Sequence, residues 1–164
     1  MQPADTETSS IKNKIVLIFA TGFGLGFSPV APGTAGAVLG LVITMLASHL
    51  KWIWQIIIYT GLIAIAVPIC GMAEQIFKQR DDRRIVADEI CAFPLCALGL
   101  ELAKRSWWFV AIVFVINRVM DIIKPPPARQ AQGLSGGLGI VADDIFSSLY
   151  ALLCNYIILR LIGG

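Results

Sequence analysis

The sequence predicts an all-α fold, a compact helical membrane bundle of about five to six helices, on two observations. First, hydrophobic residues make up 57% of the 164 residues, charged residues only 15%, and the mean hydropathy is +0.77. Soluble domains are nearer half apolar and a quarter charged. Second, the apolar residues form long runs without alternation of period two, and a helix satisfies its own backbone hydrogen bonds in lipid.

The first two long runs predict a helical hairpin over residues 35–50 and 52–73. The second run contains no ionisable residue, begins with Trp52 and Trp54, and is long enough to cross a hydrocarbon core of about 30 Å. Lys51 is the only charge between the two runs. We therefore expect a tight turn there.

The N-terminal region allows several arrangements. We expect a polar tail over residues 1–14, followed by one helical membrane domain over residues 15–164. The apolar stretch at 15–27 reaches only about 20 Å as a helix, so it could span partly, re-enter or lie on the surface.

Three more apolar stretches follow, at residues 90–102, 107–123 and 145–162. Each is expected to form a helix that crosses the bundle. The intervening segment 124–139 holds three consecutive prolines and several glycines, which indicates an irregular loop.

If these helices cross in alternation, residues 28–34, 74–89 and 121–144 lie on one face of the bundle. Eight of the eleven acidic residues fall in these regions: Glu74, Asp81, Asp82, Asp88, Glu89, Asp121, Asp143 and Asp144. Carboxylates at helix ends repel one another unless a cation or water neutralises them. The acids could equally cap helices and solvate the loops.

A metal site is the functional alternative. Mg²⁺ takes oxygen ligands, uses a few carboxylates and leaves positions for water and a substrate phosphate. The pairs Asp88–Glu89 and Asp143–Asp144, with Asp121, supply such ligands from three separate helix ends. The site is therefore expected at helix ends on one face.

Basic groups accompany these acids. Arg118, Asp121 and Lys124 are spaced by three residues, so on a helix they could share one side and hold an anionic phosphate against a metal. Ordinary interfacial cations give the same pattern. The glycine-rich stretch 133–139 precedes the Asp143–Asp144 pair, and its backbone N–H groups could hold phosphate oxygens.

Three ordered sequence blocks resemble the phosphatidylglycerophosphatase A family. They are SPVAPGTAG from Ser28, DDRRIVADE from Asp81, and RVMDIIKPPP from Arg118 followed by GGLGIVADD from Gly136. The resemblance covers residues 23–150. Asp82 stands where the family usually has proline, Ala92 replaces a glycine, and the serines at 147 and 148 replace a small Ala-Gly pair.

The resemblance implies an all-helical enzyme that removes the terminal phosphate from phosphatidylglycerophosphate, with Mg²⁺, at the cytoplasmic side of a bacterial inner membrane. Its catalytic residues would be Asp88, Glu89, Asp121, Lys124, Asp143 and Asp144, and all of these acids would be metal ligands. Ser28, Thr34, Arg118, Gly136 and Gly137 would bind the phosphate of the phospholipid substrate. Either water or an aspartate could be the nucleophile.

Two other function classes compete with this interpretation. A small cation transporter or channel subunit would also carry membrane-adjacent carboxylates, and a structural membrane partner would need none of them for activity. The net charge of +2, without a basic run, argues against nucleic acid as a partner. The sequence predicts no particular oligomeric state.

Overall fold

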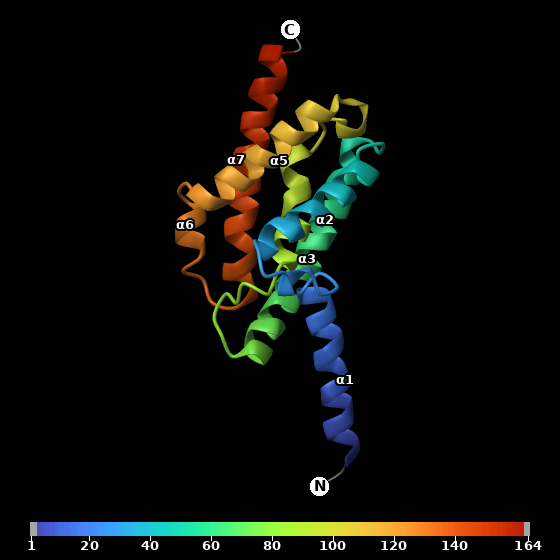
Figure 1. The fold of residues 1–164 in the computed structure, drawn as a ribbon, viewed down its shortest axis with the longest axis vertical. Helices are drawn as coiled ribbons and strands as arrows, with labels where there is room; N and C mark the ends of the chain where they lie inside the picture. The colour runs from blue at the N-terminus through green and yellow to red at the C-terminus, as the bar shows by residue number, and fades with distance from the viewer. Residues whose placement is uncertain (1–2, 163–164) are drawn as a thin grey trace.

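The computed structural model describes residues 3–162, and this part of the chain is helical without strands. The predicted all-α bundle is confirmed. Within these residues there are seven α-helices rather than five or six, because two short ones, α4 and α6, lie in segments expected to be a longer helix and a loop. They are α1 (Pro3–Ala20), α2 (Pro32–Ala47), α3 (Trp52–Phe77), α4 (Ala87–Ala92), α5 (Trp107–Ile123), α6 (Ala128–Ala131) and α7 (Gly137–Ile162). Figure 1 shows their arrangement.

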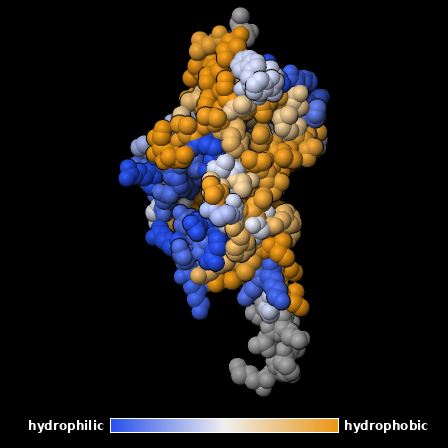
Figure 2. All heavy atoms as spheres, viewed as in Figure 1, coloured by the Kyte–Doolittle hydropathy of each residue, from blue (hydrophilic) through white to orange (hydrophobic). Residues whose placement is uncertain are grey.

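Helices α3 and α7 are long and apolar enough to cross a membrane. Each has 26 residues and so reaches about 39 Å, more than the hydrocarbon core of about 30 Å. Figure 2 shows hydrophobic residues over the upper part of the molecule, whereas hydrophilic residues gather around α6 and the loop between α3 and α4. This distribution supports membrane association.

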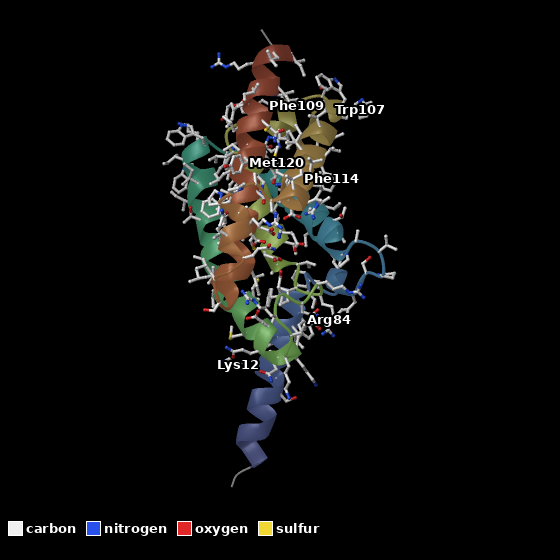
Figure 3. All side chains as sticks on the ribbon, turned by 90° about the vertical axis from the view of Figure 1, so that its left-hand side faces the viewer. Lys12, Arg84, Trp107, Phe109, Phe114 and Met120 are labelled. Carbon is white, nitrogen blue, oxygen red and sulfur yellow. The ribbon has the colours of Figure 1, made fainter. Side chains whose placement is uncertain are left out.

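One end of the bundle carries exposed tryptophans. The expected hairpin between α2 and α3 turns here, at residues 48–51. Trp52, Trp54, Trp107 and Trp108 are all exposed at the starts of α3 and α5, and Figure 3 shows Trp107 far from Arg84 at the other end. Tryptophan side chains favour the membrane–water interface, so this end fits an interfacial position.

The prediction of one helix over residues 90–102 is wrong. Helix α4 ends at Ala92, a 3-10 turn follows over Phe93–Ala97, and another covers Leu102–Lys104. Pro94 lacks a backbone N–H and favours such a break, and Gly99 adopts a positive φ of 73°. The segment is too short to cross a membrane as a helix, and Phe93, Cys96, Leu100 and Leu102 form the centre of a core cluster instead.

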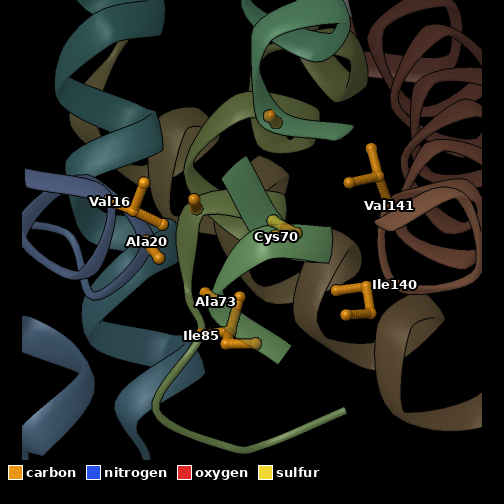
Figure 4. Close-up of a cluster of buried hydrophobic side chains, with 9 residues drawn as sticks. Val16, Ala20, Cys70, Ala73, Ile85, Ile140 and Val141 are labelled. Atoms are coloured by element: carbon orange, nitrogen blue, oxygen red, sulfur yellow. The ribbon is translucent and has the colours of Figure 1, made fainter. Parts of the chain in front are cut away.

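The N-terminal segment is a helix that begins before the apolar stretch. α1 continues through residue 14 to Ala20, and a turn and a 3-10 helix at Leu25–Phe27 follow it. The stretch 15–27 is therefore helical only in its first part. The division at residue 14 stays a prediction. Val16 and Ala20 belong to a second core cluster that also contains Cys70, Ala73 and Val141 (Figure 4).

Close helix contacts depend on glycines. A Cβ on Gly36 or Gly40 of α2 would lie 3.0 or 2.7 Å from Val86 or Phe93, so these glycines let α2 approach α4. A Cβ on Gly137 would lie 1.8 Å from the carbonyl oxygen of Val67, so α7 starts in direct contact with α3. Small residues that allow helix backbones to approach are typical of membrane helix packing.

Candidate active site

Three carboxylates meet in the interior of the bundle. Asp88 and Glu89 come from the first turn of α4, and Asp144 comes from α7, which packs against α4. One oxygen atom of each lies within 4.8 Å of the others, close enough to share a cation. Both aspartates are 6% exposed, and Glu89 is half-buried. Glu89 and Asp144 are 55 positions apart in the sequence, so folding builds this cluster.

The cluster holds more negative charge than its protein partners neutralise. Asp88 Oδ1, Glu89 Oε2 and Asp144 Oδ2 are buried and accept no hydrogen bond from the described residues. Burial raises the pKa of Asp88, and its neighbours Glu89 and Asp144 raise it further. Burial also raises the pKa of Glu89, although Arg118 opposes that shift. Buried carboxylates with free oxygens are the donor set that a hard divalent cation uses, so the residues fit Mg²⁺.

Asp121 lies beside this cluster and is bound to an arginine. The Arg118 Nη2 group donates to Asp121 Oδ2 over 2.7 Å, one turn apart on α5. Both side chains line a small cavity that also contacts Glu89 and Asp144. Arg118 therefore places a guanidinium next to the acidic cluster. A planar guanidinium has further N–H donors for an anionic oxygen.

Asp143 faces a different cation. Its Oδ2 accepts a hydrogen bond from the ammonium group of Lys124, the residue that follows α5 in a left-handed conformation with φ 47°. Burial lowers the pKa of Lys124, but the bond to Asp143 and the negative charges of Asp143, Asp144 and Asp121 together outweigh it, and the net pKa is raised. Asp143 and Asp144 are adjacent on α7, so they serve different partners: Asp143 pairs with Lys124, while Asp144 joins Asp88 and Glu89.

The predicted phosphate-binding residues do not all join the cavity. Arg118 lines it, but the Ser28 hydroxyl donates to the Val30 carbonyl oxygen in an exposed loop. Thr34 is half-buried in the first turn of α2. Gly136 lines a separate depression with Glu74, Arg80 and Asp81, and Gly137 packs against α3.

Three residues of the site were missed by sequence reasoning. Asn117 and Ser148 line the same cavity and are joined by a hydrogen bond of 3.0 Å from the Asn117 amide to the Ser148 hydroxyl. Gly33 lies so near that a Cβ there would be 2.2 Å from Glu89 Oε1. Helix periodicity is a signal that could have found two of them, because Asn117 precedes Asp121, and Ser148 follows Asp144, by four residues.

Comparison with known proteins agrees with this arrangement. A model of the family described as Phosphatidylglycerophosphatase A matches residues 18–159. The chain belongs to the phosphatidylglycerophosphatase A family. The matched region contains every acidic and basic residue of the site described above, and the family is one of phosphatases, so the chain is a phosphatase.

Several bacterial relatives are similar over most of their length. Phosphatidylglycerophosphatase A of Escherichia coli is 33% identical over 134 residues, covering 80% of this chain and 76% of the relative. The Haemophilus influenzae protein of the same name is 29% identical over 151 residues, or 91% of each chain. A Bacteroides thetaiotaomicron protein with the provisional name phosphatidylinositol-3-phosphatase is 30% identical over 142 residues, covering 84% of this chain and 89% of the relative. No solved structure matches.

Departures from the phosphatidylglycerophosphatase A pattern have local explanations. Asp82, which replaces the usual proline, accepts bonds of 2.6 and 2.8 Å from the Arg84 side chain and one of 2.9 Å from the Arg84 backbone N–H. This pairing lowers the pKa of Asp82. Ala92 is buried where α4 ends, and Ser148 bonds Asn117. The first and last of these residues thus gain polar partners within this chain.

Proposed function

We propose that the chain hydrolyses the terminal phosphate monoester of phosphatidylglycerophosphate to give phosphatidylglycerol, and that the reaction depends on Mg²⁺. The observation that carries the proposal is the cluster of Asp88, Glu89 and Asp144, whose buried oxygens lack partners among the described residues and lie beside Arg118. Family membership supplies the phosphatase chemistry, and two relatives bear the name of this activity.

The chain's residues divide into two groups in this proposal. Asp88, Glu89 and Asp144 would hold Mg²⁺, which when bound offsets negative charge on phosphate and lowers the pKa of water. Arg118, positioned by Asp121, directs its remaining N–H groups at the phosphoryl oxygens as charge develops on them. Lys124 pairs with Asp143, the residue next to Asp144, and so adds positive charge beside the acidic cluster.

Two possible nucleophiles, water and a carboxylate oxygen, predict different reaction intermediates. Water attack releases phosphate in one step, with no covalent enzyme species. Attack by a carboxylate oxygen forms an aspartyl-phosphate and expels the lipid alcohol first, after which water cleaves the acyl phosphate. Rapid mixing with labelled substrate distinguishes them. Label trapped on the protein, with a burst of alcohol equal to enzyme, supports the covalent route.

A second substrate is favoured by one relative. The Bacteroides protein is named for phosphatidylinositol 3-phosphate, which also presents a phosphate monoester on a lipid headgroup. Under this proposal, Arg118 would bind the phosphate in either case. The inositol ring is bulkier than glycerol, so the ratio of kcat/KM for the two lipids decides which headgroup the site accepts.

The decisive test is phosphate release by the purified full chain in detergent, on both lipids, with Mg²⁺ and after chelation. We expect chelation to abolish turnover and Mg²⁺ to restore it. Asp144→Asn should lower kcat at least about 100-fold, since it removes a charged group from the reacting centre. Glu101→Gln is the matched control, because Glu101 is exposed and pairs only with Lys104 among the described residues. Full activity without divalent metal would refute the metal role.

We also propose that the chain is a multi-pass protein of a bacterial inner membrane with this site on the cytoplasmic side. Support comes from α3 and α7 and from the distribution of basic residues, which follows the positive-inside tendency. Segments 74–89 and 121–144 contain six Lys and Arg residues, whereas the opposite end of the bundle has four, Lys51, Lys104, Arg105 and Arg160. Cysteine labelling in intact cells tests the orientation. A cysteine at exposed Arg83 should react only after permeabilisation, whereas one at exposed Lys104 should react with an impermeant reagent from outside.

A further inference from the structure

A groove separate from the acidic cavity lies between α1 and the C-terminal end of α3. It has a volume of about 470 Å³ and is lined by Lys12, Asn13, Val16, Met72, Gln75, Ile76 and Lys78. None of these residues lines the cavity around Glu89 and Asp144. The proposed phosphatase reaction does not use the groove, although its apolar residues Val16, Met72 and Ile76 also border the core of the bundle.

The polar part of the groove is positively charged. Lys12 lies on α1 and Lys78 directly follows α3, and both are exposed. Among the residues whose side chains are described, neither lysine forms an ion pair, and the lining contains no acidic residue. Asn13 and Gln75 add amide groups that can donate hydrogen bonds. This combination suits an anion with several oxygen acceptors.

The other part of the groove is apolar. Val16, Met72 and Ile76 contribute the apolar lining. On the outer surface of α1, Ile11, Ile15, Ile18 and Phe19 are between 49% and 60% exposed. Such exposed apolar residues on a helix indicate contact with lipid rather than water. Figure 3 shows Lys12 near the same end of the molecule as Arg84, where the polar loops gather.

We propose that this groove binds one anionic phospholipid that is not the molecule being hydrolysed. Its headgroup phosphate contacts the ammonium groups of Lys12 and Lys78, and an acyl chain lies along Val16, Met72 and Ile76. The bound lipid bridges α1 and α3. Free phosphate lacks the apolar part that matches this lining, and a zwitterionic lipid adds a headgroup cation that the two lysines repel.

Native mass spectrometry of the full chain in detergent tests the proposal with phosphatidylglycerol and phosphatidylcholine as probes. The groove variant Lys12→Gln/Lys78→Asn removes both charges, and asparagine tolerates the left-handed conformation at residue 78, where φ is 54°. The control variant Lys14→Gln/Lys51→Gln removes two exposed charges that do not line the groove. The variant Lys12→Arg/Lys78→Arg keeps the charge.

We expect the wild type to retain phosphatidylglycerol in preference to phosphatidylcholine. Each lysine near an anionic lipid contributes about fivefold in affinity, so the groove variant should bind phosphatidylglycerol about 25-fold more weakly. The control and arginine variants should bind like the wild type, and millimolar inorganic phosphate should not displace the lipid. Circular dichroism verifies that all variants keep their helical content.

Four results would overturn the proposal: unchanged binding in the groove variant, an equal loss in the control variant, equal retention of the two lipids, or displacement by inorganic phosphate. The readout is lipid binding, so it stands whether or not the chain hydrolyses phosphatidylglycerophosphate. Phosphate release by the groove variant, measured in parallel, should match the wild type because its substitutions lie outside the acidic cavity.

Discussion

Replacing Gly33 by alanine should inactivate the enzyme without removing any functional group. Gly33 is the second residue of α2 and lies against the acidic cluster. An added Cβ would be 2.2 Å from Glu89 Oε1 and 3.5 Å from Arg118 Nη2. Ordinary contact begins at 3.4 Å, so the Glu89 carboxylate must move by 3.4 − 2.2 = 1.2 Å.

The displacement is large for a catalytic group. A misplacement of about 1 Å costs on the order of 100-fold in rate, so we expect kcat to fall by about that factor. The fold should survive, because the obstructing atom ends a flexible side chain and alanine in a helix is about 0.5–1 kcal/mol more favourable than glycine. The Gly33→Ala variant should therefore lose activity but keep its thermal stability.

Phosphate release and thermal unfolding, measured on the same preparation, check this expectation. Gly61→Ala is the matched control, since nothing lies within 4 Å of a Cβ at that helical position. It should keep wild-type kcat. If Gly33→Ala turned over substrate at the wild-type rate, the contact between α2 and Glu89 would not set the geometry of the site.

Three further predictions concern other contacts. Gly137→Ala would place a Cβ 1.8 Å from the Val67 carbonyl oxygen, so it should lower the free energy of unfolding by about 1–3 kcal/mol or more, measured in denaturant. Asp82→Asn should lower the melting temperature at neutral pH. Because the pKa of Asp82 is lowered in the folded state, this stabilisation exists above its unfolded pKa and disappears as the pH falls through the folded value, so the two melting curves should converge in acid. Asn117→Ala removes the donor to Ser148 beside Arg118 and should raise KM more than Ser148→Ala, as steady-state kinetics can show.

Local sequence rules predicted much of the site. The expected alternation of helices grouped the acids of α4, α5 and α7 on one face, although one of its crossing helices, over residues 90–102, does not form. The three-residue spacing also placed Arg118 and Asp121 on one side of α5, where they form a hydrogen bond. Lys124, which the same spacing grouped with them, follows the end of α5 and binds Asp143 instead. These features depend on the spacing of residues along a helix and on the order of the helices in the chain, both of which can be seen in a single sequence.

Other features depend on packing partners that the sequence does not name. Gly137 looks like part of a phosphate-binding loop, yet it is the point where α7 touches α3. Gly33 and Gly40 both lie on α2, but the first faces a carboxylate and the second faces Phe93. Asp143 and Asp144 point to different sides of α7 because they are neighbours on a helix. Asp143 therefore pairs with Lys124, and Asp144 joins the acidic residues of α4, but only the folded positions of Lys124 and α4 reveal this.

The broken segment at residues 87–97 explains how the acidic cluster can lie inside the bundle. A full membrane helix there would place Asp88 and Glu89 at the surface, level with the other helix ends. Asp144, however, is the eighth residue of α7, about 10 Å from its start. The short α4, followed by the turn at Pro94, packs between α2 and α7 and brings its first turn to the depth of Asp144. The apolar sequence after Glu89 therefore fills the core. Because α4 ends early, Asp88 and Glu89 reach the depth of Asp144.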